Sequence, residues 1–265
     1  MFFAKGHGTG NDFVVIPDLD ASIELTAPQV AAICDRRRGV GGDGIMRVVH
    51  AAKHPDAQEQ SGEAEWFMDY RNADGSIAEM CGNGVRVFAR YLLESGLSSG
   101  SAVPVATRAG LRTIEVVGDD LEADMSSARF LGTERVTLAG TEYEGTHVSM
   151  GNPHLVVRVT DDELDALDLT GDPAVDPAVF PNKANIEFIS PTATGVRMRV
   201  HERGVGETLS CGTGACAAGA VGLDAGTGVA TVDVPGGRLT VTVDDDTLRL
   251  RGPAVMVAEG RFRLL

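Results

Sequence analysis

Two cysteines with matching surroundings are the residues of this sequence best suited to chemistry. Cys81 begins the segment CGNG, Cys211 begins CGTG, and each segment runs into a stretch with helical spacing. Each thiol is therefore expected at a helix N-terminus, where unpaired N–H groups and the positive end of the helix dipole favour thiolate and attract anions. The neighbouring glycines let a ligand approach the backbone closely.

A matched pair of thiols suits a reaction that inverts a carbon stereocentre. Such a reaction needs a base on one face of the carbon and an acid on the other, and the two exchange roles when the reaction reverses. The pKa of a cysteine, about 8.5 in a free chain, must fall for it to act as a base near neutral pH, and the helix N-terminus is expected to supply that shift. N–H groups there can also hold a carboxylate. They belong to Gly82, Asn83, Gly212 and Thr213.

Other roles for the cysteines fit the sequence less well. Zinc is disfavoured, because Cys211 and Cys216 lack CxxC spacing and no second cysteine lies near Cys81. A non-catalytic amino-acid-binding or redox-sensing protein, in which Cys81 and Cys211 close into a disulfide, stays an alternative. Cys34 and Cys216 are expected to be small buried core residues.

Composition excludes several classes of protein. The 265 residues carry 38 acidic and 23 basic side chains, a net charge of −15, which argues against a nucleic-acid partner. No apolar run approaches the roughly 20 residues needed to span a bilayer. The opening MFFAK lacks the features of a secretory signal, so we expect a cytoplasmic protein without membrane contact.

Three segments have the pattern of helices. A capping box of Thr26 and Gln29 predicts a helix over 26–38. The segment 85–94, after CGNG, places apolar residues at i, i+3, i+4 and i+7, whereas 215–223 (ACAAGAVGL) carries no charge on any face. A helix that is apolar all round is buried all round, so this last one is expected at the centre of a sheet. The polar stretch 51–65 is expected to be a surface loop.

The two halves of the chain repeat the same features in the same order. Gly10 and Asn11 precede a β-branched strand, as Gly151 and Asn152 do, and a CGxG segment follows in each half. This ordered self-similarity indicates an internal duplication. We expect an α+β fold of two domains, 1–125 and 126–265, related by a pseudo-two-fold axis, each a curled, mostly antiparallel sheet around a central helix. The strand at 255–257 is assigned to the second sheet, although the C-terminal tail can also pack back onto the first domain.

Five longer segments together resemble a known family. They are GTGNDF, RNADGSIAEMCGNG, GNPH, NIEF and ERGVGETLSCGTGA. Over essentially the whole chain they are similar to the diaminopimelate epimerases, which interconvert LL- and meso-diaminopimelate for lysine and peptidoglycan synthesis. Racemases of proline and hydroxyproline also use two cysteines, but they resemble CGHG at the first site, so Asn83 favours diaminopimelate. PhzF-like isomerases lack the paired cysteines.

The resemblance implies roles for particular residues. Cys81 and Cys211 are implied as acid and base, in an order that the sequence leaves open. The substrate site is implied to be lined by Asn11, Asn72, Asn152, Asn185, Glu202 and Arg203. Arg203 is expected to pair with the distal carboxylate, since a guanidinium makes a bidentate fork to a carboxylate. His154 and Glu202 are implied to modulate the pKa values of the cysteines, with a purely structural histidine as the alternative for His154.

The resemblance also implies a homodimer without a cofactor. Pyridoxal phosphate is disfavoured independently, because only Lys5, Lys53 and Lys183 could form its Schiff base and none lies in a convincing cofactor setting. One departure from the family pattern concerns Gly44, where some members have glutamine. Either another group makes that contact here or the backbone does.

Overall fold

The computed structural model describes residues 1–245 and 247–263, which divide into two compact units. Unit 1 contains Met1–Ala123 together with the described residues from Pro253 onward, and unit 2 contains those of Asp124–Gly252. Within these stretches no helix is long and apolar enough to cross a membrane. The last described strand therefore joins the first unit, whereas the range 126–265 had grouped it with the second.

Unit 1 is built from eight strands, two α-helices and two short 3₁₀ helices among its described residues. In chain order they are β1 (Phe2–Gly8), β2 (Asn11–Pro17), α1 (Ala27–Cys34), β3 (Gly44–His50), η1 (Ala51–Lys53), η2 (Gln58–Gln60), β4 (Trp66–Asn72), α2 (Gly82–Glu94), β5 (Ala102–Ala106), β6 (Arg112–Val117), β7 (Asp120–Asp124) and β18 (Val255–Arg261).

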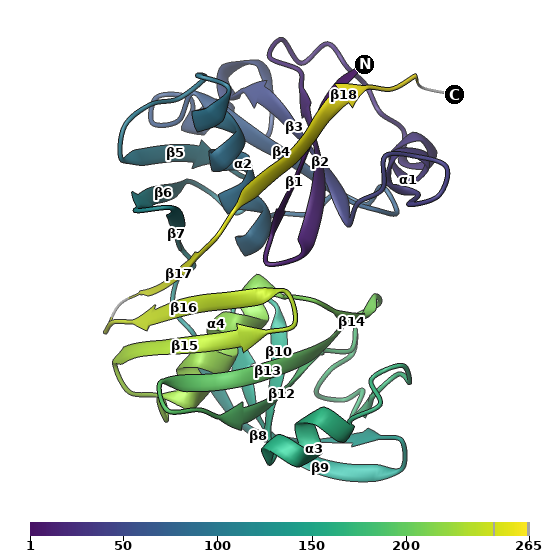
Figure 1. Cartoon of the computed structure of the whole chain (residues 1–265), viewed down its shortest axis with the longest axis vertical. Helices are drawn as coiled ribbons and strands as arrows, with labels where there is room; N and C mark the ends of the chain where they lie inside the picture. The colour runs from purple at the N-terminus through teal and green to yellow at the C-terminus, as the bar shows by residue number, and fades with distance from the viewer. Residues whose placement is uncertain (246, 264–265) are drawn as a thin grey trace. The chain divides into compact units, whose positions relative to one another are not determined.

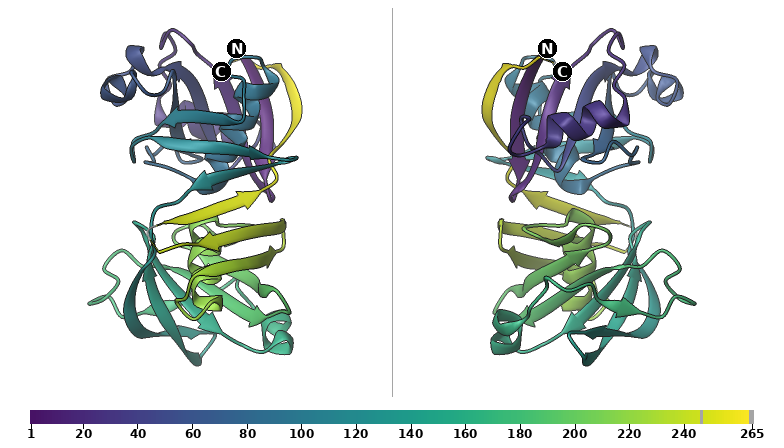
Figure 2. Two further views of the ribbon diagram at one scale, coloured as in Figure 1. Left: turned by 90° about the vertical axis from the view of Figure 1, so that its left-hand side faces the viewer. Right: turned by 90° about the vertical axis from the view of Figure 1, so that its right-hand side faces the viewer.

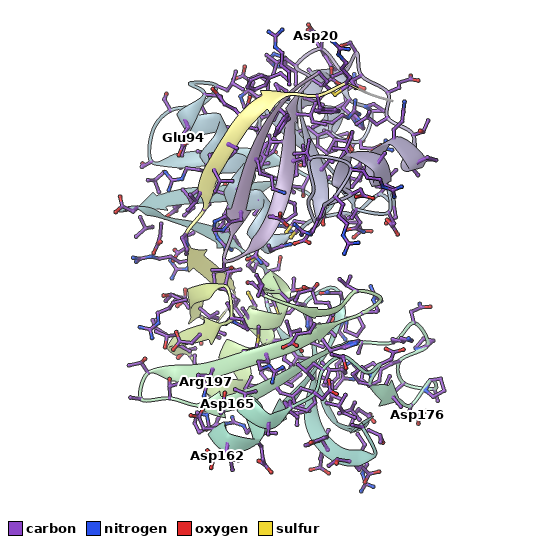
Figure 3. All side chains as sticks on the ribbon, turned by 45° about the vertical axis from the view of Figure 1, so that its right-hand side comes forward. Asp20, Glu94, Asp162, Asp165, Asp176 and Arg197 are labelled. Carbon is purple, nitrogen blue, oxygen red and sulfur yellow. The ribbon has the colours of Figure 1, made fainter. Side chains whose placement is uncertain are left out.

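Unit 2 contains the remaining elements. They are β8 (Arg129–Leu138), β9 (Thr141–Ser149), β10 (Pro153–Arg158), α3 (Asp161–Ala166), β11 (Ala174–Val175), β12 (Asn185–Pro191), β13 (Gly195–Glu202), β14 (Gly206–Thr208), α4 (Gly212–Gly222), β15 (Gly228–Val234), β16 (Gly237–Val243) and β17 (Leu248–Gly252). The short helix α3 is held to β13 by Arg197, which pairs with Asp161 at 2.6 Å. Arg197 also pairs with Asp165 of the same helix, and these two residues are labelled in Figure 3.

The same pattern of strand pairing occurs in both units. In unit 1 the order is β18–β1–β2–β3–β4–β5–β6–β7, with parallel pairs at β2–β3 and β4–β5 and antiparallel pairs elsewhere. In unit 2 the order β8–β9–β10–β12–β13–β15–β16–β17 has its parallel pairs at the same two steps, β10–β12 and β13–β15. The α+β class and the internal duplication are confirmed, and each sheet is mixed with antiparallel pairs in the majority.

One buried helix lies at the centre of each sheet. In α2 the apolar face of Val85, Phe88, Ala89 and Leu92 is 0% exposed. Helix α4 is buried along nearly its whole length, and a Cβ on Gly219 would lie 2.7 Å from Val241 of β16, so the helix backbone packs directly on the sheet. Strands β13, β15 and β16 run alongside α4 (Figure 1). The sequence therefore predicted the central position of the uncharged helix correctly.

The assignment of the last strand to the second sheet is wrong, and the alternative of a C-terminal tail that packs back onto the first domain is correct. Strand β18 pairs antiparallel with β1, from Phe2 opposite Arg261 to His7 opposite Val255. Figure 2 shows β18, in yellow, beside β1, in purple, and the Met1 ammonium donates to the Phe262 carbonyl at 2.7 Å. The pattern of one strand does not specify its partner, because pairing depends on which sheet has an open edge.

Two local predictions were also wrong in their extent. The first helix ends at Cys34, not Arg38, because the Asp35 carboxylate accepts the backbone N–H groups of Arg37 and Arg38 at 2.8 Å and turns the chain. The stretch 51–65 includes η1 and η2, and its Ala51, Ala57 and Ala64 contribute to a buried apolar cluster. The charged and amide residues around these alanines dominate the composition of the segment, so its buried apolar positions were not recognised in the sequence.

Candidate functional site

Cys81 lies at the N-cap of α2, as its sequence context predicts. Its Sγ accepts the backbone N–H of Gly84 at 3.4 Å. A Cβ on Gly84 would lie 3.2 Å from the Cys81 Cβ and 3.4 Å from the Phe13 ring, so glycine suits this tight first turn. The thiol is partly exposed, whereas Gly82 and Asn83 are buried beside it.

Asn11 is brought to Cys81 by the start of β2. Its Nδ2 donates to Asp43 at 2.7 Å, which turns its Oδ1 toward the Cys81 Sγ at 3.6 Å and the Asn83 Nδ2 at 3.4 Å. A carboxylate only accepts hydrogen bonds, so Asp43 fixes the orientation of this amide. Cys81 therefore faces an acceptor oxygen, to which a thiol donates.

Asn72 lies at the end of β4, directly opposite Gly44 of β3. Its Oδ1 accepts from the Tyr70 hydroxyl at 2.9 Å and its Nδ2 donates to the Ser76 hydroxyl at 3.0 Å. A Cβ on Gly44 would lie 2.5 Å from the Arg71 carbonyl oxygen and 2.7 Å from Cε2 of Tyr70. The Tyr70 ring thus occupies the space where a larger side chain at position 44 would begin.

Cys211 occupies the matching N-cap of α4. Its Sγ accepts the Gly214 N–H at 3.4 Å and lies 3.6 Å from the Thr213 hydroxyl. Thr213 in turn accepts from Asn152 Nδ2 at 3.3 Å. The predicted residues Asn152, Cys211, Gly212 and Thr213 are therefore together in unit 2, as Asn11, Cys81, Gly82 and Asn83 are in unit 1.

His154 connects this cluster to a carboxylate that the sequence analysis missed. Its Nε2 lies 3.0 Å from Asn152 Oδ1, and its Nδ1 lies 2.7 Å from Oε1 of Glu187 on β12. Both side chains of this pair are fully buried. The segment NIEFI contained a usable signal, since a charged residue between Ile186 and Phe188 on a buried strand needs a specific partner.

The other predicted residues of unit 2 lie at the ends of β12 and β13. Asn185 donates from Nδ2 to the Pro153 carbonyl at 3.3 Å and accepts the Arg203 backbone N–H at 3.0 Å. Glu202 accepts from the Thr208 hydroxyl. These contacts hold the turn from β13 to β14, from which the side chain of Arg203 extends.

The pKa of Cys211 departs from the expectation of a lowered value. Burial raises the pKa of this thiol well above its usual range, and the carboxylates of Glu202 and Glu187 raise it further. The Thr213 hydroxyl and the Gly214 N–H act in the opposite direction but are outweighed. Two helix N-terminal donors do not offset the loss of water around a sulfur that is only 7% exposed.

A sequence model described as diaminopimelate epimerase matches residues 3–131 and 146–262. The chain belongs to the diaminopimelate epimerase family. Diaminopimelate epimerase of Rhodococcus jostii (strain RHA1) is 50% identical over 281 residues, covering 98% of this chain and 96% of the relative. That of Thermobifida fusca (strain YX) is 51% identical over 273 residues, covering 100% and 98%. The family resemblance inferred from five short segments is thus confirmed over the full length.

Solved structures share the fold at lower identity. A PhzF-family phenazine biosynthesis protein of Bacillus anthracis aligns with a TM-score of 0.71 at 19% identity, covering 98% of both chains. A hydroxyproline epimerase of Agrobacterium vitis aligns with a TM-score of 0.67 at 15% identity, covering 98% of this chain and 91% of that one. At such identities the likeness supports the duplicated α+β architecture and nothing finer.

Proposed function

We propose that this chain epimerises LL-diaminopimelate to meso-diaminopimelate without a cofactor, in the synthesis of lysine and peptidoglycan precursors. The observation that carries the proposal is a sequence identity of 50–51%, over essentially the full length of the chain, to curated diaminopimelate epimerases. The structure of each unit supports the same proposal, since each presents a thiol at the N-cap of a buried helix.

In the proposed reaction the two thiols exchange a proton with one α-carbon. One cysteine, as thiolate, removes the α-proton and becomes a thiol, leaving the electron pair on the substrate. The other, as thiol, delivers its proton to the opposite face and becomes the thiolate. The first N–H groups of α2 and α4 would hold the α-carboxylate and stabilise the charge that develops on it.

The remaining site residues are proposed for recognition of the substrate. Arg203 would pair with the distal carboxylate, and the amides of Asn11, Asn72, Asn152 and Asn185 would donate and accept around the two amino-acid groups. Glu202 and His154 would tune the thiols. The geometry within each unit is compatible with these roles, because these amides lie beside the thiols or at the ends of the strands that lead to them.

Incubation with LL-diaminopimelate in D₂O and reductant tests the proposal. We expect deuterium at the α-carbon and formation of the meso isomer, followed by mass spectrometry and chiral chromatography. Exchange with proline but not with diaminopimelate would assign the chain to the other two-cysteine racemases instead. Absence of exchange with either, together with reversible closure of a Cys81–Cys211 disulfide, would favour the redox-sensing alternative.

Cytoplasmic location and a homodimer complete the proposal. The homodimer rests on the family resemblance, and the cytoplasmic location rests on the expectation from the sequence given above. Sedimentation of the purified chain at several concentrations tests the second, since a dimer of one chain has twice the mass of 27.7 kDa.

A further inference from the structure

Arg86 is a fully buried guanidinium on α2 to which the proposed reaction gives no role. It donates to the Gly82 carbonyl at 3.0 Å and to Asn83 Oδ1 at 2.9 Å, both in the first turn of its own helix. The end of β1 packs on this pair, where a Cβ on Gly8 would lie 3.3 Å from Arg86 Nη2 and 3.2 Å from the Asn83 carbonyl oxygen. Burial of a charged group costs free energy, so a guanidinium retained at this place calls for an explanation.

Arg86 determines the direction of the Asn83 amide. A guanidinium only donates hydrogen bonds, so the end of the amide that faces Arg86 is Oδ1. The Nδ2 end is thereby directed to Asn11, whose Oδ1 it contacts at 3.4 Å. Asn83 is itself fully buried. Its amide can therefore act on a ligand only through a neighbour, and Asn11 is placed to be that neighbour.

Asp43 fixes the opposite end of the same row of hydrogen bonds. Its Oδ2 accepts from Asn11 Nδ2 at 2.7 Å and from the Asp12 backbone N–H at 3.1 Å. An oxygen that accepts from a backbone N–H is an acceptor for Asn11 as well. The row Arg86–Asn83–Asn11–Asp43, here called the amide relay, thus begins at a group that only donates and ends at an acceptor. Every hydrogen bond in it points the same way.

The equivalent amide of unit 2 points the other way. Asn152 directs its Nδ2 to Thr213 at 3.3 Å, whereas Asn11 directs its Oδ1 to Asn83, the residue that matches Thr213. In place of the guanidinium, unit 2 has the uncharged Cys216. The shared backbone therefore does not set the direction of the amide, and the groups at the two ends of the relay are left to do so.

We propose that Arg86 and Asp43 are positioning residues that hold the Asn11 amide in one direction, with its Oδ1 toward Cys81. That oxygen accepts from the Cys81 thiol, 3.6 Å away. The inference rests on the proposed function, in which Asn11 lines the substrate site beside this thiol. An amide that could turn would present its donor and its acceptor to the substrate in either order. The relay sets one order before the substrate binds, which lowers the cost of binding.

The test is hydrogen exchange of the side-chain amides in protein labelled with ¹⁵N at asparagine alone, followed by NMR in D₂O. In Arg86→Met, the Nδ2 protons of both Asn83 and Asn11 should exchange about tenfold faster than in the wild type, because one oriented hydrogen bond after the other is weakened. In Asp43→Ala, the same two amides should be affected by a similar factor. Arg86 is hydrogen-bonded to Asn83, and Asp43 to Asn11, so a change that reaches the far amide has passed along the relay.

Arg90→Met is the matched control. Arg90 lies one turn further along α2 and donates to the main-chain carbonyls of Ala254 and Asp119 at 3.1 and 2.6 Å. Its replacement removes a cation from the same helix without removing a member of the relay, and should leave exchange at both amides unchanged. The amide of Asn152 in unit 2 is the internal reference and should not change in any variant.

A change confined to the nearer amide, at Asn83 in Arg86→Met or at Asn11 in Asp43→Ala, would overturn the proposal. Equal acceleration in Arg90→Met would also overturn it, because general loosening of α2 would then explain the result. If Arg86→Met does not fold, Asp43→Ala decides alone, since the Asp43 side chain is 39% exposed and its loss is easier to accommodate.

Amide exchange needs no substrate, so its outcome is separable from that of the proposed function. With LL-diaminopimelate, Arg86→Met and Asp43→Ala should each lower kcat/KM about tenfold, and Arg90→Met should not. An unchanged kcat/KM in both relay variants would overturn the role in recognition. Transmitted exchange without any epimerisation by the wild type would refute only the reaction, and epimerisation with exchange confined to the nearer amide would refute only the relay.

Discussion

The two thiol regions have the same backbone and different chemistry behind it. Asn11 and Asn152 both follow a glycine with positive φ, 84° at Gly10 and 92° at Gly151, and both stand beside a cysteine that caps a buried helix. Two residues further along each strand, however, unit 1 has Phe13 where unit 2 has His154. The two units therefore share the backbone turn, the asparagine and the N-cap cysteine but differ in the residue that packs beside them.

The strand registers extend this comparison to the residue beneath each helix. Phe13 is opposite Gly44 and His154 is opposite Asn185, so Met46 of β3 corresponds to Glu187 of β12. Both are fully buried. The first thiol therefore has the apolar side chains of Phe13 and Met46 at the positions where the second has the ionisable pair of His154 and Glu187. The strand pairing is the same in both units.

The charges also differ inside the two helices. Arg86, five residues after Cys81, is fully buried and donates to the Gly82 carbonyl at 3.0 Å and to Asn83 Oδ1 at 2.9 Å. The matching residue after Cys211 is Cys216, an uncharged core residue. A buried cation thus belongs to the first helix and a buried carboxylate lies beneath the second. Two sites with one geometry can in this way hold thiols of different acidity.

The largest effect is expected from removal of either thiol. Cys81→Ala and Cys211→Ala should each lower epimerisation by about a thousandfold or more, since one face of the α-carbon loses its proton carrier. The rate of meso-diaminopimelate formation measures this. Cys34→Ala and Cys216→Ala are the matched controls, one in each unit, and should retain most of the activity. Substantial turnover by one of the two variants would mean that only one region carries catalysis.

The next largest effect concerns stability and the buried cation of unit 1. Arg86→Met should lower the free energy of unfolding by about 2–4 kcal/mol, because it removes charge-assisted hydrogen bonds and leaves Asn83 Oδ1 and the Gly82 carbonyl with fewer donors. Cys216→Ala at the matching position should cost about 1 kcal/mol, from lost packing alone. Urea denaturation of both variants makes the comparison. Equal costs would show that Arg86 contributes no more than its volume.

A smaller contrast is expected from the third residue of each helix. Alanine gains up to about 1 kcal/mol over glycine inside a helix. At Gly84 the added Cβ meets neighbours at 3.2 and 3.4 Å, so Gly84→Ala should be close to neutral. At Gly214 it meets Glu187 Oε1 at 2.5 Å, so Gly214→Ala should cost about 1–3 kcal/mol. In a Glu187→Ala background that cost should disappear, and its persistence would place the clash elsewhere.

How much of this was readable from the sequence depends on the range of the interaction. The capped helices and the duplication follow from local spacing and repeated order, whereas the clusters of Asn11 with Cys81 and of Asn152 with Cys211 were expected from the family resemblance. The pairing of His154 with Glu187 joins residues 33 positions apart, and only the register of β10 with β12 brings them together. Likewise, β18 carries no local sign that its partner is β1.

The acidity of Cys211 shows the same limit. A helix N-terminus is visible in a sequence, and its donors alone favour a thiolate. Burial is a property of the fold, and here it reverses the sign of the shift. The asymmetry between the two thiols could therefore not be deduced from CGNG and CGTG.

The smallest expected effect is a difference in reactivity between the two thiols of the unmodified protein. Iodoacetamide reacts with the thiolate, and each unit by which a pKa is raised leaves about tenfold less thiolate below it. Burial and two carboxylates raise the pKa of Cys211, whereas Cys81 is partly exposed. At pH 8 we expect Cys211 to react at least about tenfold more slowly than Cys81, as measured by mass spectrometry of alkylated peptides.

The raised pKa of Cys211 also gives stability a definite pH dependence. Its folded-state pKa lies above the unfolded value of about 8.5, so the folded protein holds this proton more tightly. The stability that this contributes is fully present below pH 8.5 and is lost as the pH rises toward the folded pKa. Urea denaturation between pH 7 and 10 should therefore show a shallower alkaline decline for Cys211→Ala than for the wild type. A parallel decline in both, combined with equal alkylation rates, would mean that the two thiols are alike despite the different residues behind them.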